Sequence, residues 1–226
     1  MSRLERLADV RVLQLDVTNG ADIKDAVNAV SEETPGGSLL YLINCAARNH
    51  FMPLLDEDIE SAKKIHETNV WGPLAVTQAF APLLIKAKGT IVFNTSVSGH
   101  LNVPYQDTYA ASKMSEEIMA ETLRLELAPF QVKVLSVVSG GLKTMVQTHF
   151  DDWKLPKSSK YAQVEETIHE RARGQEGAPR MEPEEYADRV VSEIIKGRTG
   201  RFWYGTSDAG VQMKTGLDVL SKEKRD

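Results

Sequence analysis

The chain has 226 residues, of which 42% are hydrophobic, and this is enough to bury one sizeable core. Its 27 basic and 32 acidic residues give a net charge of -5 and are spread along the sequence, which argues against a nucleic-acid-binding surface. We expect a single domain over residues 1–226, with no nucleic acid among its partners.

The single cysteine, Cys45, cannot form a disulfide within the chain, and its place in an apolar run predicts a small buried side chain rather than a nucleophile. The first residues carry no signal-peptide pattern, and no apolar run approaches the roughly 18 residues that span a bilayer. We expect a cytoplasmic protein in a reducing compartment, without a membrane span.

The first half of the chain alternates short apolar runs with longer amphipathic ones, which is typical of strands and helices that take turns in a parallel sheet. Residues 10–15 are predicted as a strand, and residues 21–33 as a helix because their apolar side chains recur on one face. Residues 39–44 are nearly all apolar, as expected for a strand buried on both faces. Residues 58–86 predict two helical stretches, the second of which begins near Asn69.

The second half continues this alternation. Strands are predicted at residues 90–94, 132–138 and 201–204, and helices at residues 108–128 and 183–196. Between them, residues 145–180 are polar and irregular. We therefore predict an α/β fold with a mostly parallel sheet and helices on both faces.

Several polar residues follow directly after a predicted strand: Asp16, Asn44, Ser96 and the segment 140–144. Ligands of open parallel sheets bind outside the carboxyl ends of the strands. We expect these residues to lie together along one edge of the sheet.

Tyr109 and Lys113 stand four residues apart in the predicted helix 108–128, so both project from one face. A phenol titrates near about 10, and a neighbouring ammonium favours its ionised form, so the pair can act as a proton-transfer device. Ser96 can hold the same substrate oxygen by a hydrogen bond. The same four-residue spacing also occurs by chance on surface helices.

The motifs around this pair occur in an order typical of one family. They are Leu15-Asp16-Val17-Thr18, Asn44-Cys45-Ala46-Ala47, Asn69-Val70-Trp71-Gly72, Asn94-Thr95-Ser96-Val97-Ser98-Gly99, Pro104, Tyr109, Ser112, Lys113 and Ser139-Gly140-Gly141-Leu142-Lys143-Thr144, with Ser139 where the family has proline. Over residues 10–204 the chain resembles the classical short-chain dehydrogenase/reductase family, and among its members the fungal acyl-dihydroxyacetone-phosphate reductases.

This resemblance implies an incomplete Rossmann-type, doubly wound sheet. It also implies an oxidoreductase that passes a hydride between NADP(H) or NAD(H) and a carbonyl or alcohol of an apolar small molecule. By the same resemblance Tyr109 is the acid or base, Ser96 anchors the substrate oxygen, and Lys113 lowers the phenol pKa and contacts the nicotinamide ribose. Asn69 bends its helix to hold a water relay; alternatively, it is a helix N-cap.

The implied cofactor-binding residues are Asp16, Asn44, Tyr109, Lys113, Leu142 and Thr144. The family's TGxxxGxG turn, which receives the cofactor pyrophosphate, does not occur in the sequence, so we expect an N-terminally truncated family domain without the first β-α-β unit. The residue that separates NAD from NADP belongs to that missing unit. The alternative is a cofactor-free relative that acts as an isomerase, dehydratase or cyclase, or a binding scaffold.

Without a first strand, the edge of the predicted strand 39–44 has no neighbour, and open edges favour aggregation. Residues 10–15 can pair with it directly, a partner chain can cover it, or the chain is an incomplete version of a longer protein. We favour the first arrangement, which moves Asp16 away from any adenine pocket.

Residues 145–181 fall where the family has a substrate lid. Their side chains Met145, Phe150, Trp153 and Tyr161 suggest an apolar substrate, although such residues equally often close a small satellite core.

The five histidines, His50, His66, His100, His149 and His169, have no metal-ligand spacing, so no metal is expected. The family's usual homodimers and homotetramers pair the helices that correspond to residues 108–128, which implies a homo-oligomer.

Overall fold

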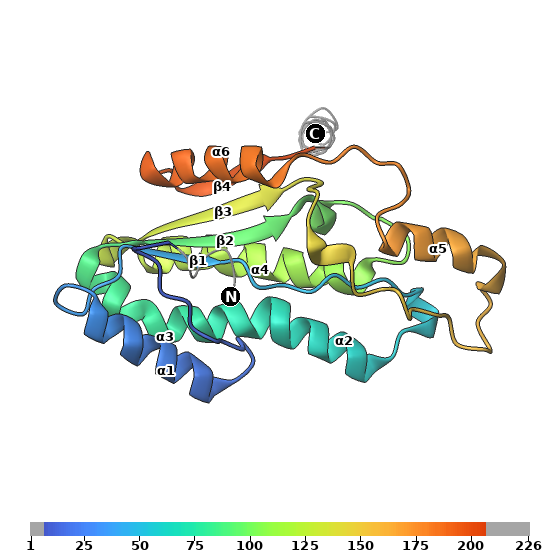
Figure 1. The fold of residues 1–226 in the computed structure, drawn as a ribbon, viewed down its shortest axis with the longest axis horizontal. Helices are drawn as coiled ribbons and strands as arrows, with labels where there is room; N and C mark the ends of the chain where they lie inside the picture. Colours follow the sequence, from blue (N-terminus) through green and yellow to red (C-terminus); the bar gives the residue numbers. More distant parts are fainter. Residues whose placement is uncertain (1–6, 207–226) are drawn as a thin grey trace, which may run out of the picture.

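Four parallel strands form a single sheet, in the order β1-β2-β3-β4, within residues 7–206, the part of the chain that the computed structural model describes (Figure 1). The principal elements are α1 (Gly20–Glu33), β1 (Tyr41–Asn44), α2 (Ile59–His66), α3 (Gly72–Ala87), β2 (Thr90–Ser96), α4 (Asp107–Glu126), β3 (Lys133–Ser139), α5 (Glu165–Ala172), α6 (Pro183–Ile195) and β4 (Gly200–Tyr204). The predicted α/β fold is confirmed.

Helices cover both faces of the sheet, with α1, α3 and α4 on one side and α6 on the other (Figure 1). The alternation of side chains along the strands explains the two layers, since Ile91 and Phe93 pack with α1, α3 and α4 while Val92 and Leu135 pack with α6. The two central strands, β2 and β3, are therefore buried on both faces.

The pairing of β2 with β3 brings together the two strand ends that matter most for function. Their parallel register runs from Thr90 opposite Lys133 to Ser96 opposite Ser139. Ser96 and Ser139 therefore leave the sheet side by side at its carboxyl edge.

A π-helical turn, Glu67–Trp71, joins α2 to α3, so that residues 59–87 form one continuous helical run. By length and composition this run can cross a membrane, contrary to the sequence expectation, and 44% of its apolar window is buried inside the structure. Its side chains Val76, Phe80 and Leu84 lie in the core. A core helix meets the same criterion, so the run is weak support for a membrane span.

The predicted strand at residues 10–15 is wrong, and so is its pairing with β1. Those residues form no strand and are exposed. Arg11 instead forms an ion pair with Glu33 at the end of α1, and Asp16 turns the chain into that helix. β1 is consequently an edge strand within the described residues, and Ile43, expected to be buried, is 51% exposed.

The core assignment predicts a large difference between two substitutions on neighbouring strands. Phe93→Ala removes a fully buried ring from the core and should lower the free energy of unfolding by about 3–5 kcal/mol. Ile43→Ala, on the exposed edge strand, should change it by less than about 1 kcal/mol. Urea denaturation of both variants measures the difference, and equal losses would contradict this packing.

Candidate functional site

A cavity of about 460 Å³ opens at the carboxyl edge of the sheet, beside the first turns of α4. It is lined by Cys45, Ala47, Arg48, Asn94, Thr95, Ser96, Tyr109, Lys113, Ser139, Gly140, Leu142, Thr144, Met145, Val146 and His149. We call it the edge cavity. Of the predicted site residues, Ser96, Tyr109, Lys113, Leu142 and Thr144 line it.

Ser96 and Tyr109 reach the edge cavity from different elements. Ser96 is the last residue of β2, and its hydroxyl accepts a hydrogen bond of 3.1 Å from the N–H of Ser98. This bond holds Ser96 where the strand gives way to a 3-10 turn. Tyr109 is partly exposed in the first turn of α4. The side chains of Ser96 and Tyr109 therefore line the same cavity.

Lys113 lies behind Tyr109 on the same face of α4 and is only 3% exposed. Its Nζ donates hydrogen bonds of 2.8 Å to the carbonyl of Asn94 and 2.7 Å to the Glu116 carboxylate. Burial disfavours the ammonium, but attraction by Glu116 and Tyr109 outweighs it and raises the pKa of Lys113. The side chain is thus a fixed positive charge next to the phenol.

Asn69 does not line the edge cavity but joins two of the segments around it. It lies in the π-helical turn, fully buried, where it accepts a hydrogen bond of 2.8 Å from the N–H of Arg48. Its amide donates to the Arg48 carbonyl at 2.9 Å and to the Ser112 hydroxyl at 3.0 Å. The alternative of an N-cap is wrong, because α2, the π-helical turn and α3 run on without a break. π-bulges of this kind are frequent at functional sites.

Two predicted cofactor contacts lie outside the edge cavity. Asn44 ends β1 with its amide directed to the Thr77 hydroxyl of α3, 3.2 Å away. Asp16 is exposed and accepts hydrogen bonds from Thr18 in the turn before α1, which lower the pKa of its carboxyl. Both side chains have local structural partners instead.

A polar network on the sheet side of the edge cavity was missed by the sequence reasoning. Ser139 and Tyr186 both donate to the Asn94 side-chain oxygen, at 2.5 and 2.9 Å, and they contact each other. Burial raises the pKa of Tyr186 to about 12, so this phenol stays protonated at neutral pH. The one signal in the sequence is Ser139, which stands where the family has a proline.

The residues of the predicted lid separate into three groups. Met145 is exposed and lines the edge cavity. Phe150 and Trp153 pack with Phe51, and the Phe150 and Phe51 rings meet edge to face at 5.8 Å, so these two close a satellite core. Tyr161 packs against Tyr105.

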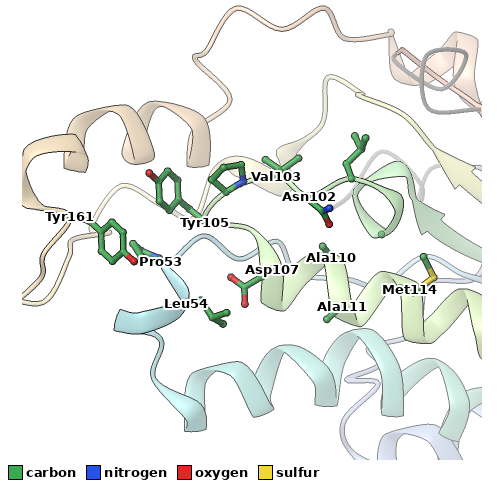
Figure 2. A pocket seen from close by; sticks show the side chains of 13 residues that line it. Pro53, Leu54, Asn102, Val103, Tyr105, Asp107, Ala110, Ala111, Met114 and Tyr161 are labelled. Atoms are coloured by element: carbon green, nitrogen blue, oxygen red, sulfur yellow. The ribbon is translucent and has the colours of Figure 1, made fainter. Parts of the chain in front are cut away.

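A second cavity, of about 570 Å³, lies on a different face of α4 (Figure 2). Ala110, Ala111 and Met114 line it together with Tyr105 and Tyr161. Neither Tyr109 nor Lys113 lines this larger space, so it is not the predicted proton-transfer site.

Cys45 lines the edge cavity and is exposed, so its predicted burial is wrong. β1 ends at Asn44, which places the next residue beyond the carboxyl edge of the sheet. Within residues 7–206 no three metal-ligating side chains gather in one place. Among the histidines, His50 and His100 instead bond to the carboxylates of Glu57 and Glu117.

Comparison with known proteins identifies the family of this chain. The sequence profile described as short chain dehydrogenase matches residues 2–155. The chain belongs to the short-chain dehydrogenase family. This membership makes the protein an oxidoreductase by class.

Two fungal relatives extend the match along most of the chain. The short-chain dehydrogenase ptmH of Penicillium ochrochloron is 41% identical over 206 residues, which cover 91% of this chain and 74% of that protein. The NADPH-dependent 1-acyldihydroxyacetone phosphate reductase of Schizosaccharomyces pombe is 34% identical over 218 residues, 94% of this chain and 72% of that protein.

Solved structures share the short-chain dehydrogenase fold. A short-chain dehydrogenase from Streptomyces avermitilis superposes with a TM-score of 0.76 at 24% identity, over 93% of this chain and 76% of that one. One from Burkholderia cenocepacia, in complex with NADP, gives a TM-score of 0.70 at 24% identity, over 95% and 79%. These likenesses agree with the parallel sheet described above.

The hydrogen bonds of Asn69 predict a structural cost for its removal. Asn69→Ala removes a fully buried amide that bonds both the N–H and the carbonyl of Arg48, and should lower the free energy of unfolding by about 1–3 kcal/mol. Asn28→Ala, at an exposed position of α1, is the control and should leave stability unchanged or slightly raised. Chemical denaturation checks both, and an unchanged Asn69→Ala variant would contradict the linking role.

Proposed function

We propose that this short-chain dehydrogenase catalyses hydride transfer between a nicotinamide cofactor and the carbonyl or alcohol group of an apolar small molecule in the edge cavity. The observation that carries the proposal is the meeting of Ser96, Tyr109 and Lys113 at one cavity, from the end of β2 and one face of α4.

Tyr109 acts as the general acid in reduction and as the general base in oxidation. The fixed Lys113 ammonium beside it stabilises the negative charge that the ring oxygen carries once its proton has left. Ser96 donates a hydrogen bond to the substrate oxygen and stabilises the negative charge that develops there. The proton thus moves between the Tyr109 hydroxyl and that oxygen.

Asn69 supports this reaction indirectly, by positioning the segments around the edge cavity. Its contacts with the Arg48 backbone and with Ser112 hold the segment after β1 against α4, one residue before Lys113. The π-helical turn around it is also where we propose the water relay to Lys113. Loss of Asn69 would therefore affect the reaction as well as the fold.

The chemistry of the cavity wall fits the nicotinamide end of the cofactor. The Lys113 ammonium has three donor hydrogens. Two bond to the Asn94 carbonyl and the Glu116 carboxylate, which leaves one for a ribose hydroxyl of the cofactor. Leu142 and Thr144 add an apolar side chain and a hydroxyl to the lining of the same cavity. When bound, the nicotinamide supplies or accepts the hydride.

We further propose NADPH as the preferred cofactor. Two relatives support this choice, since the fission-yeast reductase is NADPH-dependent and the Burkholderia cenocepacia structure contains NADP. The substrate carbonyl would lie beside Leu142, Met145 and Val146, whose side chains favour an apolar neighbourhood.

Removal of one hydroxyl tests the proposal. Tyr109→Phe keeps the ring but deletes the transferable proton, and should lower kcat for NADPH-dependent ketone reduction by about 100-fold to 10,000-fold. Tyr105→Phe, which lines the second cavity, is the matched control and should keep wild-type turnover. The rate of NADPH oxidation over a panel of aryl and aliphatic ketones measures both variants.

Either of two results would contradict the proposed function. One is a wild-type protein that binds no NADPH and reduces no ketone in the panel. The other is a Tyr109→Phe variant that reduces a ketone as fast as the wild type does.

A further inference from the structure

The buried carboxylate of Glu116 has no part in the reaction described so far. It lies on the sheet-facing side of α4, three residues after Lys113, and is 1% exposed. Burial of a carboxylate lowers the stability of the folded protein unless its charge is paired. The burial of Glu116 therefore requires a partner for its carboxylate.

Lys113 is the partner of Glu116, and among residues 7–206 it is the only cation within salt-bridge distance of that carboxylate. The Glu116 Oε2 lies 2.7 Å from Nζ. Two other ionisable side chains face Lys113: Tyr109, also on α4, and Cys45, which follows β1. Glu116 is therefore the one carboxylate beside the ammonium. Burial raises the pKa of Glu116, and the attraction of Lys113 opposes that rise.

Burial without a counter-ion lowers the pKa of an ammonium, because burial disfavours the charged form. The Asn94 carbonyl accepts one hydrogen bond from Lys113 but carries no charge. With two donors taken by Asn94 and Glu116, the third donor of Nζ is left for Tyr109 or the cofactor at the edge cavity. Glu116 therefore affects both the charge and the direction of Lys113.

We propose that Glu116 is a positioning residue for the reaction: it is the buried counter-ion that keeps Lys113 charged and aimed at the edge cavity. This inference rests on the proposed function for its catalytic consequence, but the ion pair itself does not. The raised pKa of Lys113, which burial alone would lower, agrees with it.

The direct test is the titration of Lys113 in protein that carries 13C- and 15N-labelled lysine. The Lys113 signal is identified by its absence in the Lys113→Met protein. In the wild type the side chain should stay protonated to above its ordinary value of about 10.4. In Glu116→Gln, which keeps the shape but not the charge, the midpoint should fall by at least one pH unit.

The neighbouring carboxylate provides the matched control. Glu117 is also 1% exposed, and it pairs with Arg201 and His100 instead of Lys113. Glu117→Gln should leave the Lys113 midpoint unchanged. An unchanged midpoint in Glu116→Gln, or an equal fall in Glu117→Gln, would overturn the proposal.

Kinetics supply the second measurement. Because the reaction needs the Lys113 ammonium, the fall of kcat/KM at alkaline pH should begin at least one pH unit lower in Glu116→Gln than in the wild type. Glu116→Asp keeps the charge and should restore part of this shift. A Glu116→Gln profile that coincides with the wild type would overturn the proposal.

Two further outcomes can be told apart from these: a Glu116→Gln variant that does not fold, and a wild-type protein without NADPH-dependent turnover. Circular dichroism shows whether Glu116→Gln folds; if it does not, Glu116→Asp takes its place, and its Lys113 midpoint must fall below that of the wild type. A wild-type protein without NADPH-dependent turnover would overturn the proposed function, whereas the Lys113 titration needs no turnover.

Discussion

The ammonium of Lys113 joins the sheet to the helix that carries Tyr109, the proposed acid or base of the reaction. On one side it donates to the Asn94 carbonyl of β2, and on the other to Glu116 of α4. These contacts fix the height of α4 along the strand, and with it the place of Tyr109. Ser96 follows Asn94 by two residues on the same strand. The proposed substrate anchor, Ser96, and the proposed acid, Tyr109, are therefore positioned by the same pair of contacts.

The parallel sheet accounts for the rest of the site. Because all four strands end at the same edge, the loops after β1, β2 and β3 meet there without a long excursion of the chain. Asn69 then ties the loop after β1 to α4. The proposed function is concentrated at this edge, while the apolar layers on the two faces of the sheet supply the stability.

The sequence predicted the features that depend on local periodicity, and it failed where distant residues decide. Four-residue spacing placed Tyr109 and Lys113 on one helix face, and the apolar run before it placed Ser96 at the end of a strand, as the structure has them. Residues 10–15 look like a strand, but strand formation needs a neighbour that local pattern does not reveal. Glu116 looks like an ordinary exposed helix residue, since only the tertiary structure shows that it faces Lys113.

The central claim is that hydride passes between a nicotinamide and a substrate carbon in the edge cavity. The most direct measurement follows deuterium from NADPH labelled at the transferring position into the alcohol formed from a ketone that the protein reduces. One deuterium on the carbinol carbon is the predicted result. An alcohol without deuterium from the cofactor, or conversion of the substrate with no NADPH present, would contradict the claim.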